Sequence, residues 1–136
     1  MKTLITGGRT FGEPDEDNPS KDWPAEVRRL YAALDRIHAF FVVTQVIHGR
    51  ARGADRHAGR WAGGRGIMER AFPAPWKSQG RAAGPRRNLT MFEASRPDLV
   101  VAFPGSSGTA NMIKIARDAG TKVIEITQHE MIEAVQ

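Results

Sequence analysis

Five short, mainly apolar runs, alternating with segments of helical spacing, constrain the fold of this chain more than any other feature. The runs occupy residues 2–6, 41–49, 66–72, 97–103 and 122–126, and most are followed directly by glycine or proline. Runs of this length are typical of strands buried within a sheet. Strands that alternate with helices through short connections form parallel sheets. The sequence therefore predicts an α/β fold: a parallel five-stranded sheet flanked by helices on both faces.

The segments between these runs carry apolar residues at helical intervals. A long helix is predicted from about Trp23 to Phe41, with Asp22 as a candidate cap, and a short helix from about Gly53. A third helix runs through residues 86–95, with Pro85 at its first position and Pro97 beyond its end. A fourth contains Met112 and closes at Gly120, and Thr127–Glu130 has the pattern of a capping box for a terminal helix.

Length and composition favour one domain spanning residues 1–136. The chain has no cysteine, so disulfides and thiolate metal sites are excluded. No apolar run approaches the length of a membrane span, and the first residues do not resemble a signal peptide, which together predict a cytoplasmic protein. Residues 13–22 begin with the acidic stretch EPDEDNPS, which contains two prolines and no apolar residue, so we expect a mobile loop insertion there.

Positive charge is concentrated in the middle of the chain. Residues 41–90 hold 10 basic and 2 acidic side chains, and the basic ones are mostly arginine. Arginine can bind phosphate or carboxylate groups through two hydrogen bonds, so a phosphorylated small molecule or a nucleic-acid backbone would suit this segment. A solvated basic surface is the alternative, and it is the favoured interpretation for Arg60 and Arg65.

The loops after the first four strands are rich in glycine, and the one after the fourth strand reads PGSSGT. Glycine allows close approach of a ligand to the backbone, and a helix that begins directly afterwards presents unpaired amides with partial positive charge. We therefore predict a phosphate-binding loop formed by Gly105, Ser106, Ser107, Gly108 and Thr109. Because ligands of parallel sheets bind beyond the carboxyl ends of the strands, the site should lie there.

Better-known site motifs are missing. No lysine follows a G-x-x-x-x-G pattern, TGGRTFG does not fit G-x-G-x-x-G, and GSSG does not fit G-x-S-x-G. The four histidines have no metal-ligand spacing, so neither a metal nor a cofactor is predicted. Asp55 could orient an arginine or accept hydrogen bonds from a ribose, or it could simply be a favourable acid in the first turn of a helix.

The blocks ITGGRTFG, HGRARGAD, FPAPW, AGPRRNLTM and DLVVAFPGSSGTANMI resemble short bacterial and phage proteins of the SLOG superfamily, specifically the branch that carries the DUF2493 domain. The resemblance covers nearly the whole chain except the acidic insertion. It implies a Rossmann-like domain that binds a nucleotide or a nucleotide-derived ligand, often as a homodimer or a higher assembly.

The same superfamily includes the Lonely Guy phosphoribohydrolases, whose signature is P-G-G-x-G-T-x-x-E after a helix reading R-K-x-x-M. The matching positions here are Arg87, Met91, Pro104, Gly105, Gly108 and Thr109, with Ser106 in place of the second glycine. The catalytic glutamate falls on Met112, which cannot activate water or stabilise an oxocarbenium ion. Met112 also lies on an apolar stripe and is predicted to be a core residue. A substitute carboxylate would have to come from elsewhere, with Asp55, Glu69 and Glu93 as the nearest candidates in sequence.

The leading hypothesis is a protein that binds a phosphorylated nucleotide or a nucleotide derivative in order to sense, sequester or process it. The phosphate-binding loop would hold a phosphate and Arg87 would clamp it. Gly7, Gly8 and Arg9 would border the ligand, Gly53 and Asp55 would face the ribose, and the acidic loop could close over the site. One alternative is a nucleotide N-glycosidase with a relocated acid. Another is a single-strand DNA-binding protein, because the DNA-processing protein A family shares the superfamily fold.

Overall fold

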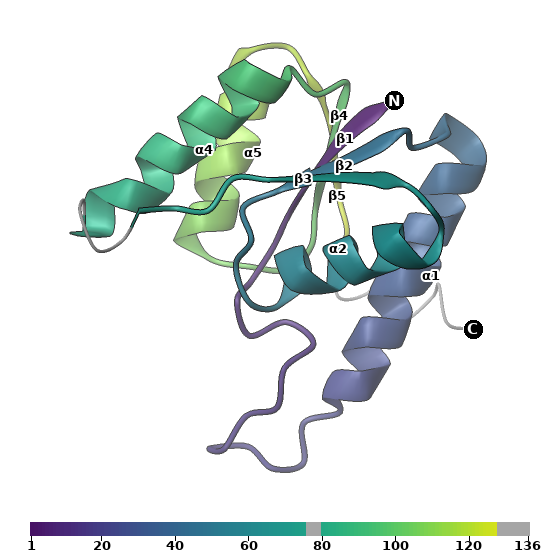
Figure 1. Ribbon diagram of the computed structural model, residues 1–136. Helices are drawn as coiled ribbons and strands as arrows, with labels where there is room; N and C mark the ends of the chain where they lie inside the picture. The colour runs from purple at the N-terminus through teal and green to yellow at the C-terminus, as the bar shows by residue number, and fades with distance from the viewer. Residues whose placement is uncertain (76–79, 128–136) are drawn as a thin grey trace.

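The computed structural model describes residues 1–75 and 80–127. Its centre is a sheet of five strands, all paired in parallel, in the order β3-β2-β1-β4-β5. The strands are β1 (Lys2–Thr6), β2 (Gln45–His48), β3 (Met68–Ala71), β4 (Leu99–Ala102) and β5 (Lys122–Glu125). The prediction of a parallel five-stranded α/β sheet is confirmed (Figure 1).

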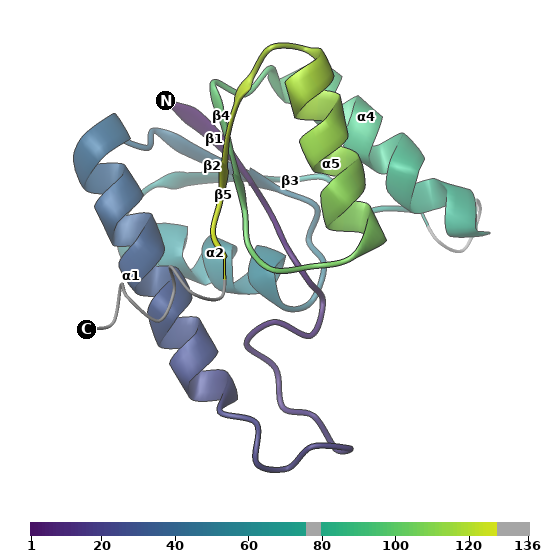
Figure 2. The same ribbon diagram turned by 180° about the vertical axis from the view of Figure 1, so that it is seen from behind.

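Helices cover both faces of the sheet, as the pattern predicted. One face carries α1 (Trp23–Phe41) and α2 (Ala54–Gly64), and the other carries α4 (Ala83–Ser95), preceded by the short 3-10 turn η1 (Gly80–Ala82), and α5 (Ser107–Asp118). Figures 1 and 2 show these two helix pairs on opposite sides of the strands. The alternation of side chains along β1 explains the division, since Ile5 belongs to the α1–α2 core and Leu4 to the α4–α5 core.

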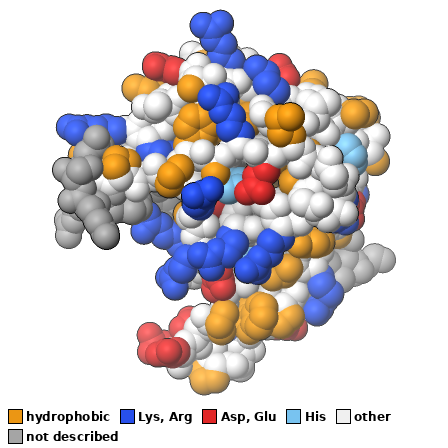
Figure 3. Space-filling model, in the orientation of Figure 1, with side chains coloured by type: hydrophobic (Ala, Val, Ile, Leu, Met, Phe, Trp, Pro, Cys, Tyr) orange, Lys and Arg blue, Asp and Glu red, His pale blue; other side chains and the backbone are white. Residues whose placement is uncertain are grey.

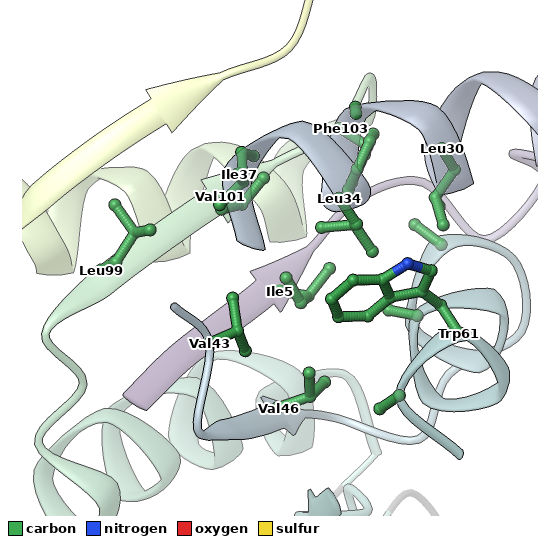
Figure 4. Close-up of a cluster of buried hydrophobic side chains, with 14 of the residues drawn as sticks. Ile5, Leu30, Leu34, Ile37, Val43, Val46, Trp61, Leu99, Val101 and Phe103 are labelled. Carbon is green, nitrogen blue, oxygen red and sulfur yellow. The ribbon is translucent and has the colours of Figure 1, made fainter. Parts of the chain in front are cut away.

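The larger core lies between the sheet and the helices α1 and α2. The Trp61 indole is fully buried there and lies among Ile5, Leu34 and Val46 (Figure 4). Its Nε1–H donates to Asp35 Oδ1 at 2.9 Å, so the polar end of the ring is also satisfied. This core fixes α2 against the sheet, and therefore fixes the turn that precedes α2.

Local signals set most of the element boundaries. Asp22 caps α1 by accepting from the Ala25 amide at 3.1 Å, as predicted. The second strand begins at Gln45 rather than Phe41, because α1 continues to Phe41 and Val42 ends it with a φ of 56°. The helix α4 begins at Ala83, so Pro85 lies inside its first turn rather than at its first position. Gly120 closes α5 with a φ of +76°, as expected.

The acidic segment 13–22 forms an exposed loop without helix or strand. Both of its ends are attached to the rest of the protein. Glu13 Oε1 accepts from the Gly53 amide at 3.1 Å, and Lys21 Nζ donates to the Thr10 carbonyl at 2.7 Å. The predicted capping box at Thr127–Glu130 lies largely outside the described residues. Within the part of the chain that is described, no helix is long and apolar enough to cross a membrane.

Candidate functional site

The strand order reverses between β1 and β4, and the loops after these two strands meet there. The Gly8 amide donates to the Pro104 carbonyl at 2.9 Å. A side chain at Gly8 would approach the same carbonyl to 2.9 Å, and a side chain at Gly105 would collide with Thr109. Glycine is therefore required at both positions for the two loops to come together. The point of reversal is where open parallel sheets bind ligands.

A cavity of about 800 Å³ opens at this point, beyond the carboxyl ends of the strands. Such a volume falls within the usual range for small-molecule sites. With the exception of Gly53, all the predicted site residues line the cavity: Gly7, Gly8, Arg9, Asp55, Arg87, Gly105, Ser106, Ser107, Gly108 and Thr109. The fold thus brings together residues from four loops or helix starts that are far apart in the sequence.

The first turn of α5 forms one wall of the cavity. The first helical hydrogen bond runs from the Ala110 amide to the Ser106 carbonyl at 3.0 Å. The amides of Ser107, Gly108 and Thr109 precede it, and the described residues supply no acceptor for them. Amides of this kind, at the positive end of a helix, are suited to bind an anion.

Arg87, on α4, is half-buried and held in a fixed position beside this wall. Its Nη1 donates to the carbonyls of Gly49, at 2.6 Å, and Phe72, at 3.0 Å, and its Nε donates to Asn88 Oδ1 at 3.0 Å. Burial lowers the pKa of Arg87 from its usual range, and the nearby Asp55 carboxylate opposes that shift. For Nη2 the described chain provides no acceptor, so this group remains for an anion in the cavity.

Asp55 is the buried acid of the site. Its Oδ2 accepts from the amides of Gly49, at 3.0 Å, and Ala51, at 3.3 Å. Burial raises the pKa of this carboxyl, while His48, the Ala51 amide and Arg87 act in the opposite direction. No donor to Oδ1 is found among the described residues. Asp55 thus fixes the turn after β2 with one oxygen and presents the other at the cavity.

Gly53 lies behind the cavity rather than in its lining. It has a φ of +78°, and a side chain there would run into the Gly8 carbonyl and the Arg9 backbone. The next amide, that of Ala54, donates to the Gly8 carbonyl at 3.1 Å. The structure therefore gives Gly53 a supporting position, in which it holds the loop of Gly8 and Arg9 in place.

Six polar residues of the cavity lining were not predicted: Thr6, Thr10, Lys21, Glu26, Asn88 and Asn111. Asn88 is buried and donates to the Gly108 carbonyl at 3.2 Å and to Asn111 Oδ1 at 3.0 Å, which links α4 and Arg87 to the start of α5. Lys21 and Glu26 enter from the other side as an ion pair of 3.2 Å. The sequence signal that could have indicated the two asparagines is their spacing: Asn88 follows Arg87 directly, and Asn111 lies one helical turn after Ser107.

Met112 is fully buried in the α4–α5 core, so its prediction as a core residue is confirmed. Among the suggested substitute carboxylates, only Asp55 lines the cavity. Glu69 pairs with His48 at the far side of β2, and Glu93 lines a different depression, next to Arg96. Glu26 is a further carboxylate at the cavity, although its Oε1 already accepts from the Gly12 amide at 3.1 Å.

The described histidines have structural partners. His38 Nδ1 accepts from the Val43 amide at 2.9 Å, and His57 Nε2 lies 3.0 Å from the Gly12 carbonyl oxygen. His48 Nδ1 accepts from the Arg50 amide at 2.9 Å, which leaves Nε2 as the donor to Glu69 Oε1 at 2.5 Å. Over residues 1–75 and 80–127, no three potential ligands are grouped as a metal site would require.

Comparison with known proteins agrees with the resemblance found in the sequence. A family model described as the YspA, cpYpsA-related SLOG family matches residues 1–78. The chain belongs to this SLOG family. The Gene 61 protein of Mycobacterium phage D29 is similar too, with 33% identity over 130 residues that cover 90% of this chain and 94% of that protein. No solved structure matches the chain. SLOG membership supports a nucleotide-related ligand without specifying which one.

Proposed function

We propose that this SLOG protein binds a phosphorylated nucleotide or a nucleotide derivative in the cavity between β1 and β4. One observation carries the proposal: Ser107, Gly108 and Thr109, whose amides have no acceptor among the described residues, line the same cavity as Arg87 and Asp55. Amides and a guanidinium suit a phosphate, and a carboxylate oxygen suits a sugar hydroxyl. A nucleotide carries both groups at a short distance from each other.

In this proposal, the α5 amides and the Ser107 and Thr109 hydroxyls hold the phosphate, and Arg87 Nη2 donates to it. Asp55 Oδ1 accepts from the ribose. The loop of Gly7, Gly8 and Arg9 borders the ligand, and Gly53 supports that loop from behind. Lys21, at the end of the acidic loop, lies at the cavity as an ion pair with Glu26.

A thermal-shift titration against a panel of nucleotides, with chromatography of the same mixtures, tests the proposal and reports any turnover. A ligand at about 100 times its Kd should stabilise the protein by about 2.7 kcal/mol. The site is tested best with Gly108→Asp, because a side chain at Gly108 would point into open space and so should not strain the fold. The added negative charge should abolish the shift produced by the nucleotide.

Gly63→Asp is the matched control. It makes the same chemical change at a helical glycine that also faces open space, but on α2 and outside the cavity lining. Its thermal shift with nucleotide should equal that of the wild type. If no nucleotide stabilises the wild-type protein, or if the two variants respond alike, the proposed site is wrong.

A second candidate, cleavage of the N-glycosidic bond, is favoured by one observation, which is that a buried carboxyl with a raised pKa lines the cavity. Such a group can serve as the acid or base that Met112 cannot provide. The chromatography should then show free base released by the wild type. Asp55→Asn should retain nucleotide binding but release none, whereas release by that variant at the wild-type rate would exclude Asp55 from this role.

A further inference from the structure

A second, smaller hollow of about 290 Å³ adjoins the cavity on the side of the turn after β2. Arg9, Ala51 and Arg87 line both spaces, so the two are adjacent and share this wall. The remaining lining includes three further arginines, Arg50, Arg52 and Arg56. We call this space the arginine hollow. The α5 amides lie in the cavity and not in the arginine hollow, so the two spaces hold separate sets of donors for anions.

Of these three arginines, Arg50 and Arg56 also line a neighbouring depression that contains Glu69, but the Glu69 carboxylate pairs with His48. Arg50, Arg52 and Arg56 are exposed, and no carboxylate of the described chain forms an ion pair with any of them. Figure 3 shows Lys and Arg side chains gathered around the start of α2 on this face. Three cations that converge on one concave space repel one another unless an anion lies between them.

The backbone that carries these arginines is fixed at each step. The amides of Gly49 and Ala51 donate to Asp55, and the Arg50 amide donates to His48 Nδ1 at 2.9 Å. Arg50 adopts a φ of 56°, which is uncommon for a residue with a side chain. A turn held by three hydrogen bonds, one of them to a buried histidine, directs its arginines to one place. The arginine hollow is therefore built on a preorganised backbone, from which the exposed arginine side chains extend.

We propose that the arginine hollow binds a second phosphate group, so that the ligand of this protein is a nucleotide with two separated phosphates. This inference rests on the proposed function, since the first phosphate lies at the start of α5 and the ligand passes Arg87 to reach the hollow. A nucleoside 3′,5′-bisphosphate and a dinucleotide with a 5′-phosphate both have this chemistry. The shared wall of Arg9, Ala51 and Arg87 lies between the two phosphate sites.

A small ligand fits these observations better than a long nucleic-acid strand. The arginine hollow is limited in volume, and none of the described residues that line it is aromatic. Binding of a single strand normally combines a positively charged groove with exposed aromatic rings on which successive bases stack. Phe72, beside the hollow, is only partly exposed, and its ring is covered by Arg70 at 4.7 Å.

Isothermal titration of the full-length protein with matched pairs of ligands tests the inference. Each pair consists of a nucleoside 5′-monophosphate and the corresponding 3′,5′-bisphosphate or 5′-phosphorylated dinucleotide, for each of the common bases. The wild type should bind the two-phosphate ligand at least tenfold more tightly. The double variant R52Q/R56Q should lose that difference and bind the monophosphate within twofold of the wild type. Arg36→Gln, which removes an exposed arginine of α1, should change neither affinity.

Three results would overturn the inference while leaving the proposed function intact. The first is equal wild-type affinity for both ligands of every pair. The second is an equal loss of affinity for both ligands of a pair in R52Q/R56Q, which would indicate only a general electrostatic effect. The third is a long single strand that binds more tightly than the dinucleotide, with a steep dependence on salt, which would make the hollow part of a nucleic-acid surface. If no nucleotide binds at all, both proposals fail.

Discussion

At the scale of single residues, Asp55 combines a structural and a chemical role. Its carboxyl holds the amides of Gly49 and Ala51, and it is buried at the cavity. Burial raises its pKa, so the folded protein binds the proton more tightly than the unfolded chain does. The stabilising contribution of the protonated form is complete below the unfolded pKa of about 3.9 and is lost as the pH rises through the folded pKa.

Asp55→Asn should remove this pH dependence, because the amide oxygen can still accept from both backbone amides and the side chain no longer titrates. Urea unfolding from pH 4 to pH 8 should show the free energy of unfolding of the variant increasing relative to the wild type as the pH rises. Asp17→Asn, at an exposed position, serves as the control and should show no such trend. A constant difference between Asp55→Asn and the wild type across this range would contradict the assignment.

Met112 is the second informative residue, because it occupies the position of an acid in a related enzyme and is fully buried here. Met112→Glu should therefore not create an active site. It should destabilise the protein by about 3 kcal/mol or more, since the carboxyl would have no partner in the apolar core. Met112→Leu should cost less than about 1.5 kcal/mol. A stable Met112→Glu variant that cleaves nucleotides would show that this side chain can reach the cavity.

At the scale of elements, the starts of the helices determine where the loops meet. Asp22 caps α1 through the Ala25 amide. Asp22→Ala should lower the free energy of unfolding by about 0.5–2 kcal/mol, as is usual for the loss of a cap. Chemical denaturation measures the change, with Asp17→Ala as a control in the same loop. An unchanged midpoint for Asp22→Ala would mean that packing of α1 alone determines its start.

The start of α2 gives a sharper contrast between two glycines. Gly53, directly before α2, has a φ of +78° and lies against the Gly8 carbonyl, whereas Gly63, within α2, faces open space. Gly53→Ala should destabilise the protein by more than about 1 kcal/mol, which is the usual scale of such backbone effects. It should also weaken ligand binding, because the added side chain displaces the loop of Gly8 and Arg9. Gly63→Ala should stabilise it by about 0.5–1 kcal/mol and leave binding unchanged. Similar effects of the two substitutions on stability would contradict the described turn.

At the scale of the whole molecule, the sheet could be predicted from sequence because each strand is a short run with a clear end. The strand Lys2–Thr6 has the predicted bounds, and β3 and β4 each begin two residues later than predicted. The largest difference is at the start of β2, where residues 41–44 precede the strand and α1 continues to Phe41. The order of the strands could not be read from the runs. That order places the loops after β1 and β4 beside each other and so decides where the cavity lies.

The glycines and serines of the site were predictable because each follows a strand end or lies at a helix start, and Arg87 was predictable because it matches the arginine of the Lonely Guy signature. Asn88, Asn111 and the Lys21–Glu26 pair were not, since they reach the cavity only through the packing of α4 on α5 and of the acidic loop beside α1. The arginine turn after β2 was recognised as basic. The position of this turn between the cavity and the arginine hollow depends on the hydrogen bonds that its amides donate to Asp55 and His48, and no local sequence pattern indicates these bonds.

The most direct test of the central claim is an amide NMR titration of the full-length protein with the nucleotide that stabilises it most. The claim is that a phosphate binds at the start of α5, next to Arg87. The amide resonances of Ser107, Gly108 and Thr109 and the Arg87 side-chain resonance should shift together, with one Kd, and inorganic phosphate should shift the same amides more weakly. Shifts confined to other surfaces, with these resonances unchanged at saturation, would contradict the claim.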